Sequence, residues 1–257
     1  MASTVRQLAG RDTEWLIEPL EPAPIDWCAM RRVIAVVARR EWARWTRPDG
    51  SKLTESDPGQ LRILAQYWSA VPGFRSASAA MSAARRSVAG DPIYPWSAAF
   101  ICFVMRTAGV RAADGFVFGP RHMEYIVGSL RNRERSDRSR PFWLVDHLEL
   151  QHEVAPEPGD LLCFNRANSQ HTYASLRRQF WSEGRQNRPT SGVSHCRVVV
   201  GTGADKRGRR FIDAIGGNEG NSVRLLRITA DEFGSIPNPQ ALNIFGLVKL
   251  IECQRPG

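Results

Sequence analysis

The stretch YPWSAAFICFVM (residues 94–105) is the most informative part of the sequence for the fold, and it contains the first candidate site. An aromatic turn that contains Pro95 leads directly into a helix that is apolar on almost every side. Ser97 stands at the start of this helix, where the first backbone N–H groups have no partner within the helix. Such a position stabilises a nucleophilic oxygen or an anion. Ser97 is therefore a candidate nucleophile, and the alternative is a plain helix N-cap, a position that serine favours.

The segments before this helix predict further helices. Over residues 26–45 apolar residues recur at helical spacing, and Asp26 is the expected N-cap. A second helix is expected to begin near Pro58, at its first position, and to extend through Trp68. The remaining helices are predicted over residues 75–89, 97–109 and 121–130. Residues 1–25 are polar and proline-rich, and we expect an extended arm.

From residue 141 onward the pattern changes to short β-branched and aromatic runs divided by Gly, Pro, Asn and Asp. Strands are predicted over residues 142–145, 160–164, 195–201, 210–215, 222–228 and 243–251, with a hairpin turn at 205–208. Helices followed by an antiparallel sheet indicate an α+β fold. Residues 131–140 are predicted to form a charged linker, 146–153 a solvated strand or linker, and 165–194 a long polar loop.

Composition and charge restrict the partners. The net charge of the 257-residue chain is +9, and only three of its 35 basic residues are lysines. This arginine bias indicates either an anionic partner or a GC-rich coding sequence. No run of about 18 apolar residues predicts a transmembrane segment. The N-terminus lacks the apolar core of a secretory signal, so we expect a cytoplasmic protein as synthesised, with signal-independent delivery to an envelope target as the alternative.

The five cysteines are scattered and contain no CxxC pair. Their apolar surroundings predict buried thiols. The pattern indicates neither a disulfide framework nor a zinc site. No phosphate-binding loop, dinucleotide fingerprint or zinc-finger spacing is present in the sequence. We therefore predict no cofactor and no metal. The cysteines are Cys28, Cys102, Cys163, Cys196 and Cys253.

Four motifs in a fixed order resemble a known superfamily. They are Trp96-Ser97-Ala98-Ala99-Phe100, Pro158-Gly159-Asp160, Ser194-His195-Cys196 and Ile215-Gly216-Gly217-Asn218. This order resembles the papain-like CHAP and NlpC-type amidases and peptidases, whose members commonly carry Trp-Cys-Ala-Ala-Phe, Pro-Gly-Asp and Gly-His-Val. It resembles more closely an uncharacterised bacterial branch, a domain-of-unknown-function family with Trp-Ser-Ala-Ala-Phe. The resemblance covers roughly residues 90–230. It implies a papain-like hydrolase-type domain over residues 91–257, with residues 1–90 as an arm and helical layer packed on it.

The resemblance also implies roles for single residues. Ser97 stands at the place of the nucleophilic cysteine and His195 at that of the base. Asn218 is the choice for orienting the imidazole, with Asp213 as runner-up, and Asp160 is expected only to bond turn backbone. The plain alternatives are a structural histidine at His195 and a turn residue at Asn218. Unlike a cysteine, which can be held as a thiolate, a serine must lose its proton to the base as it attacks.

Three more residues are expected to contact substrate. His122 belongs to a His-x-x-Tyr element, as a substrate contact or second base, or else as a histidine packed on the core. Trp96 adjoins the nucleophile, and Trp181 lies in the arginine-rich loop.

The implied function is hydrolysis of amide bonds in peptidoglycan or a related cell-envelope substrate. The alternative is a catalytically silent fold that binds a glycan, peptide or protein. The expected partner is an anionic cell-envelope polymer or peptide, with a protein for delivery or inhibition as an alternative. Nucleic acid ranks last among the partners.

Overall fold

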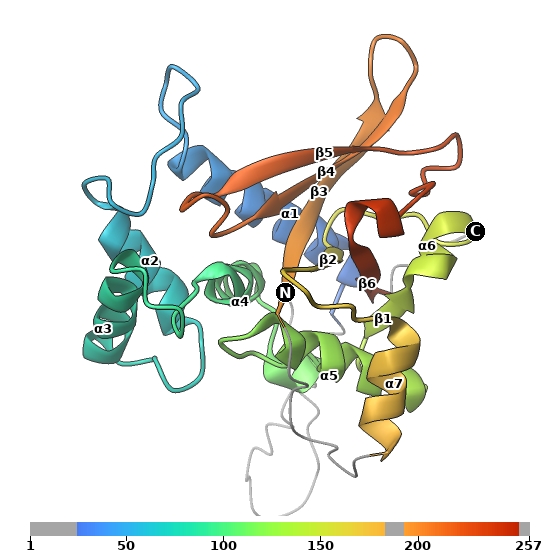
Figure 1. Cartoon of the computed structure of the whole chain (residues 1–257), viewed down its shortest axis with the longest axis horizontal. Coiled ribbons are helices and arrows are strands. Elements are labelled where there is room, and N and C mark those ends of the chain that lie inside the picture. Colours follow the sequence, from blue (N-terminus) through green and yellow to red (C-terminus); the bar gives the residue numbers. More distant parts are fainter. Residues whose placement is uncertain (1–24, 183–192, 252–257) are drawn as a thin grey trace, which may run out of the picture.

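The computed structural model describes residues 25–182 and 193–251, and the predicted α+β class is confirmed there (Figure 1). The predicted arm over residues 1–25 lies almost wholly outside these residues. The helices are α1 (Trp27–Arg44), α2 (Gln60–Ser69), α3 (Ala77–Val88), α4 (Ser97–Ala108), α5 (His122–Glu134), α6 (His147–His152) and α7 (Tyr173–Ser182). The strands are β1 (Phe142–Asp146), β2 (Leu161–Asn165), β3 (Ser194–Ala204), β4 (Arg210–Gly216), β5 (Arg224–Thr229) and β6 (Ile244–Leu250).

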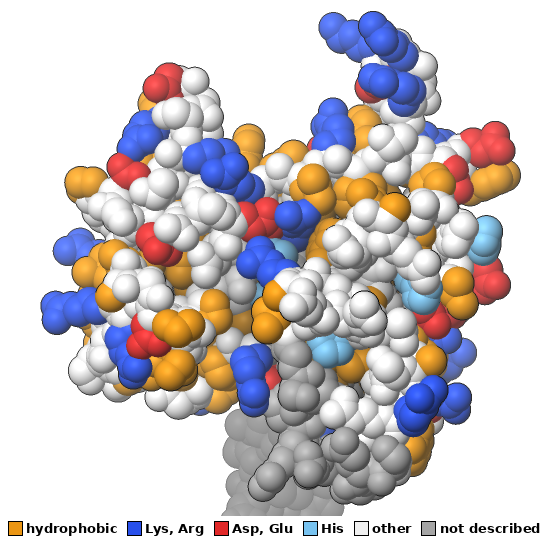
Figure 2. Space-filling model, in the orientation of Figure 1, with side chains coloured by type: hydrophobic (Ala, Val, Ile, Leu, Met, Phe, Trp, Pro, Cys, Tyr) orange, Lys and Arg blue, Asp and Glu red, His pale blue; other side chains and the backbone are white. Residues whose placement is uncertain are grey.

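The six strands form one antiparallel sheet in the order β1-β6-β2-β3-β4-β5. All six predicted strands are confirmed, and so is the hairpin turn between β3 and β4. In this turn Gly208, at a φ of +76°, donates its N–H to the carbonyl of Asp205. The hairpin projects from the body of the molecule, and Figure 2 shows Lys and Arg side chains gathered at its tip. The exposed basic residues of this tip are Lys206, Arg207, Arg209 and Arg210.

The larger hydrophobic core lies between the helices and one face of the sheet. Val198 and Val200 of β3 belong to this core, where β3 contacts α1, α4 and α5. Val199 faces the other side and joins a smaller cluster with Leu162 and Ile212, as strand alternation requires. Helices α1 and α2 share the larger core with α4. The first helices therefore pack against the same core that supports Ser97.

A buried ion pair ties α1 to the sheet. The guanidinium of Arg31 lies 2.6 Å from Asp160 Oδ1, and the Asp160 side chain is 0% exposed. Asp160 also accepts hydrogen bonds from the backbone N–H groups of Glu157 and Leu250. The prediction that Asp160 bonds turn backbone is confirmed. Its carboxylate joins α1, the turn before β2 and strand β6, so its role is structural.

Two segments expected to be irregular are helical. In α6 the carboxylate of Asp146 caps the helix and Glu149 completes the capping box, so the prediction of a strand or linker over 146–153 is wrong. The predicted loop over 165–194 contains α7, where Leu176 and Phe180, one turn apart, are buried. Thr172 accepts from the N–H of Ser175 at its start. Both helices are too short to show a clear apolar periodicity. The capping residues at their starts were the signal that could have predicted them.

The prediction of unpaired cysteines is wrong at three positions. Cys163 and Cys196 are register partners on neighbouring strands and form a buried disulfide with a Cα–Cα distance of 4.2 Å. Cys28 is also disulfide-bonded. Cys102 is a buried free thiol, and burial raises its pKa to about 12. Thirty-three residues separate Cys163 from Cys196, so only strand pairing reveals that they are neighbours.

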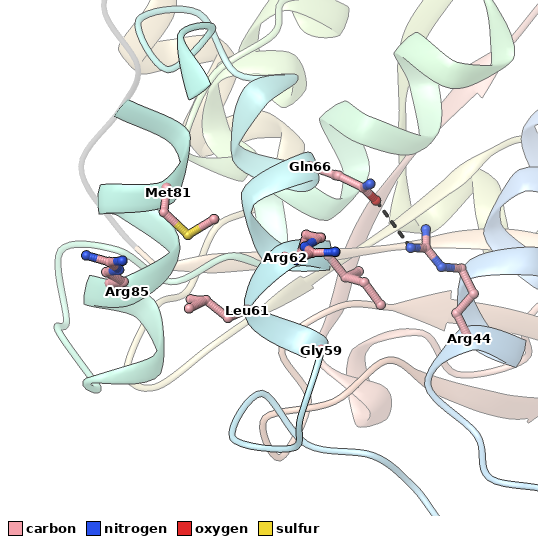
Figure 3. A pocket seen from close by; sticks show the side chains of 8 residues that line it. Arg44, Gly59, Leu61, Arg62, Gln66, Met81 and Arg85 are labelled. Carbon is pink, nitrogen blue, oxygen red and sulfur yellow. Dashed lines mark hydrogen bonds between the residues drawn. The ribbon is translucent and has the colours of Figure 1, made fainter. Parts of the chain in front are cut away.

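No helix within residues 25–182 and 193–251 is long and apolar enough to cross a membrane. Those residues also contain no group of three or more His, Cys, Asp or Glu side chains placed to hold a metal ion. A cavity of about 500 Å³ lies along α1, α2 and α3 (Figure 3). It includes none of the candidate site residues. Its lining consists of Arg44, Gly59, Leu61, Arg62, Ile63, Gln66, Met81 and Arg85.

Candidate functional site

Ser97 is the first residue of α4, and its hydroxyl is bound to a histidine. The N-cap position belongs to Trp96, so the alternative of a plain N-cap at Ser97 is wrong. Ser97 Oγ lies 2.7 Å from Nε2 of His122, which is the first residue of α5. The two residues are 7% and 5% exposed. Two helix N-termini thus bring together a hydroxyl and an imidazole that are 25 residues apart in the chain.

Trp96 holds Ser97 in place from inside the core. The structure places this residue, expected as a substrate contact, at 0% exposure. Its indole stacks on Trp45 at a centroid distance of 5.0 Å. Its Nε1 donates a hydrogen bond of 2.7 Å to Glu55 Oε2. Because the residue before Ser97 is anchored on both its ring face and its polar edge, the start of α4 has little freedom to move.

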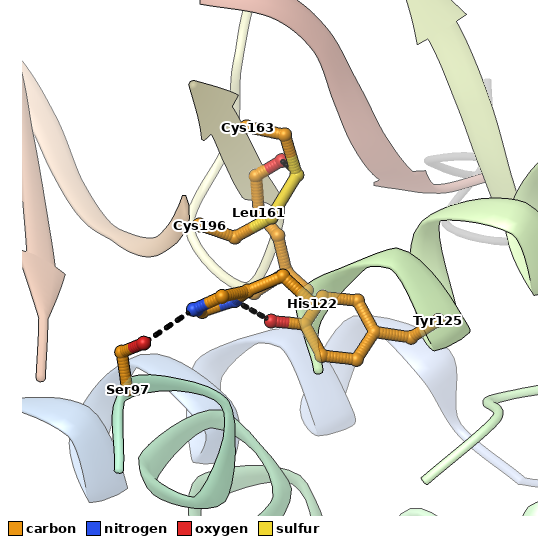
Figure 4. Close-up of a disulfide and its surroundings, with 6 residues drawn as sticks. All are labelled: Ser97, His122, Tyr125, Leu161, Cys163 and Cys196. Carbon is orange, nitrogen blue, oxygen red and sulfur yellow. Dashed lines mark hydrogen bonds between the residues drawn. A yellow bond between two sulfur atoms is a disulfide. The ribbon is translucent and has the colours of Figure 1, made fainter. Parts of the chain in front are cut away.

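His122 is held on both ring nitrogens. Its Nδ1 contacts the hydroxyl of Tyr125, which lies one helical turn further along α5, and its Nε2 contacts Ser97 (Figure 4). Burial lowers the pKa of His122 well below its ordinary value, with smaller contributions from His195 and Arg166. Burial also raises the pKa of Tyr125. At neutral pH the site therefore contains a neutral imidazole between two uncharged hydroxyl groups.

A second imidazole lies beside the first. The rings of His195 and His122 are 5.1 Å apart between centroids, and Nε2 of His195 lies 2.8 Å from Glu219 Oε1. Burial lowers the pKa of His195 and outweighs the opposing effect of the Glu219 carboxylate. A neutral His195 donates its Nε2–H to Glu219. Its Nδ1 is buried and has no hydrogen-bond partner among residues 25–182 and 193–251.

Glu219 is ionised because Arg197 binds it with two nitrogens. Arg197 Nε and Nη2 lie 2.6 and 2.7 Å from the two carboxylate oxygens. Burial of Glu219 raises its pKa, but the hydrogen bonds from His195 and Arg197 lower the pKa by more than burial raises it. The resulting pKa is about 2. Arg197 and His195 both lie on β3, so the strand carries the imidazole and the cation that fixes its carboxylate partner.

Two glycines at the end of β4, Gly216 and Gly217, make room for this arrangement. A Cβ atom on Gly216 would lie 2.1 Å from Glu219 Oε1 and 2.8 Å from His195 Nε2. One on Gly217 would lie 2.6 Å from the Phe100 side chain and 2.8 Å from that of Trp96. Any larger side chain at these positions displaces either the Glu219–His195 pair or the anchor of Ser97.

Three of the candidate residues make no hydrogen bond to Ser97, His122 or His195 within the described chain. Asn218 has a φ of +58°, typical of a turn residue, and within the described chain its side chain makes no hydrogen bond. Its neighbour Glu219 bonds His195 in its place. Asp213 forms a bidentate ion pair with Arg227, at 2.8 Å to each oxygen. Trp181, on α7, is 55% exposed and donates to Glu134.

Sequence reasoning overlooked Glu219, Arg197 and Arg166. Glu219 directly follows the predicted Asn218, and Arg197 lies two residues beyond His195, on the same face of a strand. Side-chain alternation along β3 was therefore a usable signal for Arg197. Nothing in the spacing pointed to Arg166, which follows β2 and lies opposite the start of β3.

Replacing Glu219 with glutamine should change the dependence of stability on pH. The ordinary pKa of this carboxyl is near 4.5 and its folded value is about 2, so ionised Glu219 stabilises the fold above pH 4.5. That contribution is lost as the pH falls from 4.5 towards 2. We expect Glu219→Gln to lower the free energy of unfolding by about 3 kcal/mol at pH 7.

Urea unfolding of both proteins at a series of pH values measures this difference. The gap should narrow between about pH 4.5 and 2. Glu153→Gln, an exposed change at the C-cap of α6, is the control. A gap that is the same at pH 7 and pH 2 would contradict the assignment of Glu219 as the titrating group.

A family model described as "Uncharacterized protein conserved in bacteria (DUF2272)" matches residues 55–248, more than half of the chain. The match begins at Glu55, which anchors Trp96, and spans every residue of the site. The predicted membership of an uncharacterised bacterial branch is confirmed, while the papain-like assignment stays a prediction. No curated protein and no solved structure matches the chain.

Proposed function

The chain belongs to this family of uncharacterised bacterial proteins, and from its site we propose that it is a hydrolase of amide bonds with Ser97 as nucleophile. The observation that carries the proposal is the 2.7 Å contact between Ser97 Oγ and His122 Nε2 at the N-terminus of α4. A nucleophilic hydroxyl needs a base within hydrogen-bond reach and a third group that orients the base. Tyr125 is the third group here.

In the proposed reaction His122 carries its ring proton on Nδ1, where the oxygen of Tyr125 accepts it. Nε2 then takes the proton of Ser97 as Oγ attacks the carbonyl carbon. Backbone N–H groups at the start of α4 stabilise the oxyanion. His122 returns the proton to the leaving nitrogen, and an acyl-Ser97 ester remains. A water molecule, deprotonated in turn by Nε2, attacks that ester. The bond from the acyl carbon to Ser97 Oγ breaks, Nε2 returns the proton to Oγ, and the acid is released.

The base in this proposal is His122, and His195 has a supporting role. Nε2 of His195 is held by Glu219, whereas Nε2 of His122 lies on Ser97. The low pKa of His122 keeps its imidazole unprotonated at neutral pH, so it is ready to accept a proton. The resemblance to papain-like enzymes suggested the opposite assignment. The contacts of the two rings favour His122.

We propose a cell-envelope polymer, such as peptidoglycan, as substrate. The basic tip of the β3–β4 hairpin provides an exposed surface for an anionic polymer (Figure 2). The disulfide between Cys163 and Cys196 supports the same location, because disulfides form and persist in oxidising compartments outside the cytosol. We therefore propose that the protein is delivered to an oxidising compartment and acts there, outside the cytoplasm.

Covalent capture tests the nucleophile. A fluorophosphonate probe reacts with activated serine hydroxyls, so the wild type should gain one adduct, which peptide mass spectrometry places on Ser97. Ser97→Ala should gain none, while Ser129→Ala should react like the wild type. Ser129 is a matched control because it is also buried, at 1% exposure, and its hydroxyl has no hydrogen-bond partner among the described residues. An adduct on another residue would contradict the assignment.

Release of muropeptides from purified sacculi tests the substrate. Release by the wild type and none by Ser97→Ala would support an amide hydrolase of the cell wall, and the product masses would identify the bond. A different outcome is that the wild type neither reacts with the probe nor releases fragments, whereas Ser97→Cys releases fragments. In that case the natural chain is a binding module with an intact cleft.

A further inference from the structure

Arg166 is an exposed cation next to the proposed catalytic pair. It follows β2 directly, and its backbone N–H bonds the carbonyl of Val193, just before β3 and His195 begin. The strand register pairs Phe164 with His195 and Asn165 with Ser194, so Arg166 lies beside the start of β3. Its charge lowers the pKa values of both imidazoles, and it interacts with Glu219 and Arg197 through charge alone. Within the described chain, Arg166 makes no side-chain hydrogen bond or ion pair.

Arg197, the second arginine of the site, differs from Arg166 because its guanidinium is paired. Both oxygens of Glu219 are already bound by Arg197, so the carboxylate has no position left for a second bidentate cation. Arg166 therefore remains available to a ligand. Guanidinium groups bind carboxylates in planar, two-point contacts, which makes a carboxylate the group that this position would recognise best.

The orphaned nitrogen of His195 is an independent sign of a ligand. His195 is 2% exposed, and its Nδ1 has no hydrogen-bond partner in the part of the chain that the structure describes. Because Nε2 donates to Glu219, Nδ1 of the neutral ring carries a lone pair and can only accept. A buried acceptor without a donor is costly, and a donor group of a bound ligand would remove that cost.

We infer that the substrate carries a free carboxylate beside the scissile amide, that Arg166 binds this carboxylate, and that Nδ1 of His195 accepts an N–H of the substrate. The inference rests on the proposed function, since it places the substrate against Ser97. The substrate class is thus an acylated amino acid or peptide whose carboxylate lies within one residue of the bond that is cut. The residue that leaves would be an amino acid with its acid group free.

Binding to the Ser97→Ala chain tests this inference without turnover. The probes are N-acetylalanine and N-acetylalaninamide, which differ only in the carboxylate, and an NMR titration that follows the histidine ring signals gives each Kd. We expect N-acetylalanine to bind about tenfold more tightly than the amide. Arg166→Gln in the same background should remove that preference. Arg166→Lys, which keeps the charge but loses the planar fork, should retain part of it.

Arg40→Gln is the matched control, because Arg40 is an exposed arginine on α1, away from Ser97, and should leave the preference intact. Equal Kd values for the two probes, no binding of either, or a preference that survives Arg166→Gln would overturn the inference. Fluorophosphonate capture on the wild type reports separately on Ser97. Carboxylate binding without capture would refute the proposed hydrolase and leave Arg166 as an anion site. Capture without carboxylate binding would support Ser97 as the nucleophile and refute Arg166 as the carboxylate site.

Discussion

Ser97→Ala and His122→Ala should each lower the rate of acyl transfer by about 10³- to 10⁴-fold, and the double variant should be no slower than either single variant. The reason is that the hydroxyl and the imidazole, 2.7 Å apart, act as one unit, so removing either removes the whole effect. Hydrolysis of para-nitrophenyl acetate, an activated ester that reports attack by a nucleophile, provides the rate. Additive losses in the double variant would indicate two independent contributions.

Two further histidine variants separate the catalytic base from its neighbours. His147→Ala is the control, because His147 is buried like His122 but lies on α6 and pairs with Asp146 and Gln240. It should retain the wild-type rate. His195→Ala should lose much less than His122→Ala, since the Ser97 hydroxyl contacts only the ring of His122 within the described chain. A complete loss in His195→Ala together with a modest loss in His122→Ala would instead make His195 the base.

The pH profile provides another test of the same assignment. The base must be unprotonated to accept the Ser97 proton, and burial holds the pKa of His122 well below 6.5. Activity should therefore persist as the pH falls through 6.5, and the acid limb of the profile should lie below that value. A midpoint at or above pH 6.5 would contradict a buried, neutral His122 as the base.

Removal of the Cys163–Cys196 disulfide should cause the largest loss of stability. The bond closes a segment of 33 residues, and the chain-entropy model gives a loss of about 3–4 kcal/mol when it is absent. For a chain of this size the melting temperature should fall by about 10 °C. The double variant Cys163→Ala/Cys196→Ala, followed by calorimetry and urea unfolding, measures this loss.

Cys102→Ala separates the bond from the packing of the sulfur atoms. Cys102 is a buried free thiol, so its truncation leaves only a small cavity. It should cost clearly less than half of the double variant's loss. Reduction of the wild type is a weaker test, because Cys28 is disulfide-bonded as well. An equal loss in Cys102→Ala and the double variant would show that packing, and not the cross-link, is responsible.

The disulfide also links stability to the site. Cys196 directly follows His195 on β3, and Figure 4 shows the disulfide beside His122. Its loss would loosen β3 where it meets β2, at the residues that hold the second imidazole. We therefore expect the double variant to lose part of its reactivity at Ser97 in addition to its stability.

Local sequence patterns were enough to predict the order of the elements and one partner of the proposed catalytic pair. Strand alternation and helical periodicity are local properties, so the α+β class, six strands and the helix that begins at Ser97 could all be predicted. The His-x-x-Tyr spacing of His122 and Tyr125 is also local, because one helical turn brings these side chains together.

Which of these groups contact one another depends on long-range packing. Ser97 and His122 begin two different helices, and His195 and Glu219 come from β3 and the turn after β4. Their contacts depend on how helices pack on the sheet, and no spacing in the chain records that. The pairing of Cys163 with Cys196 needed the register of β2 on β3 for the same reason. Local periodicity specifies elements, whereas the site arises from long-range packing, which selected His122 as the partner of Ser97.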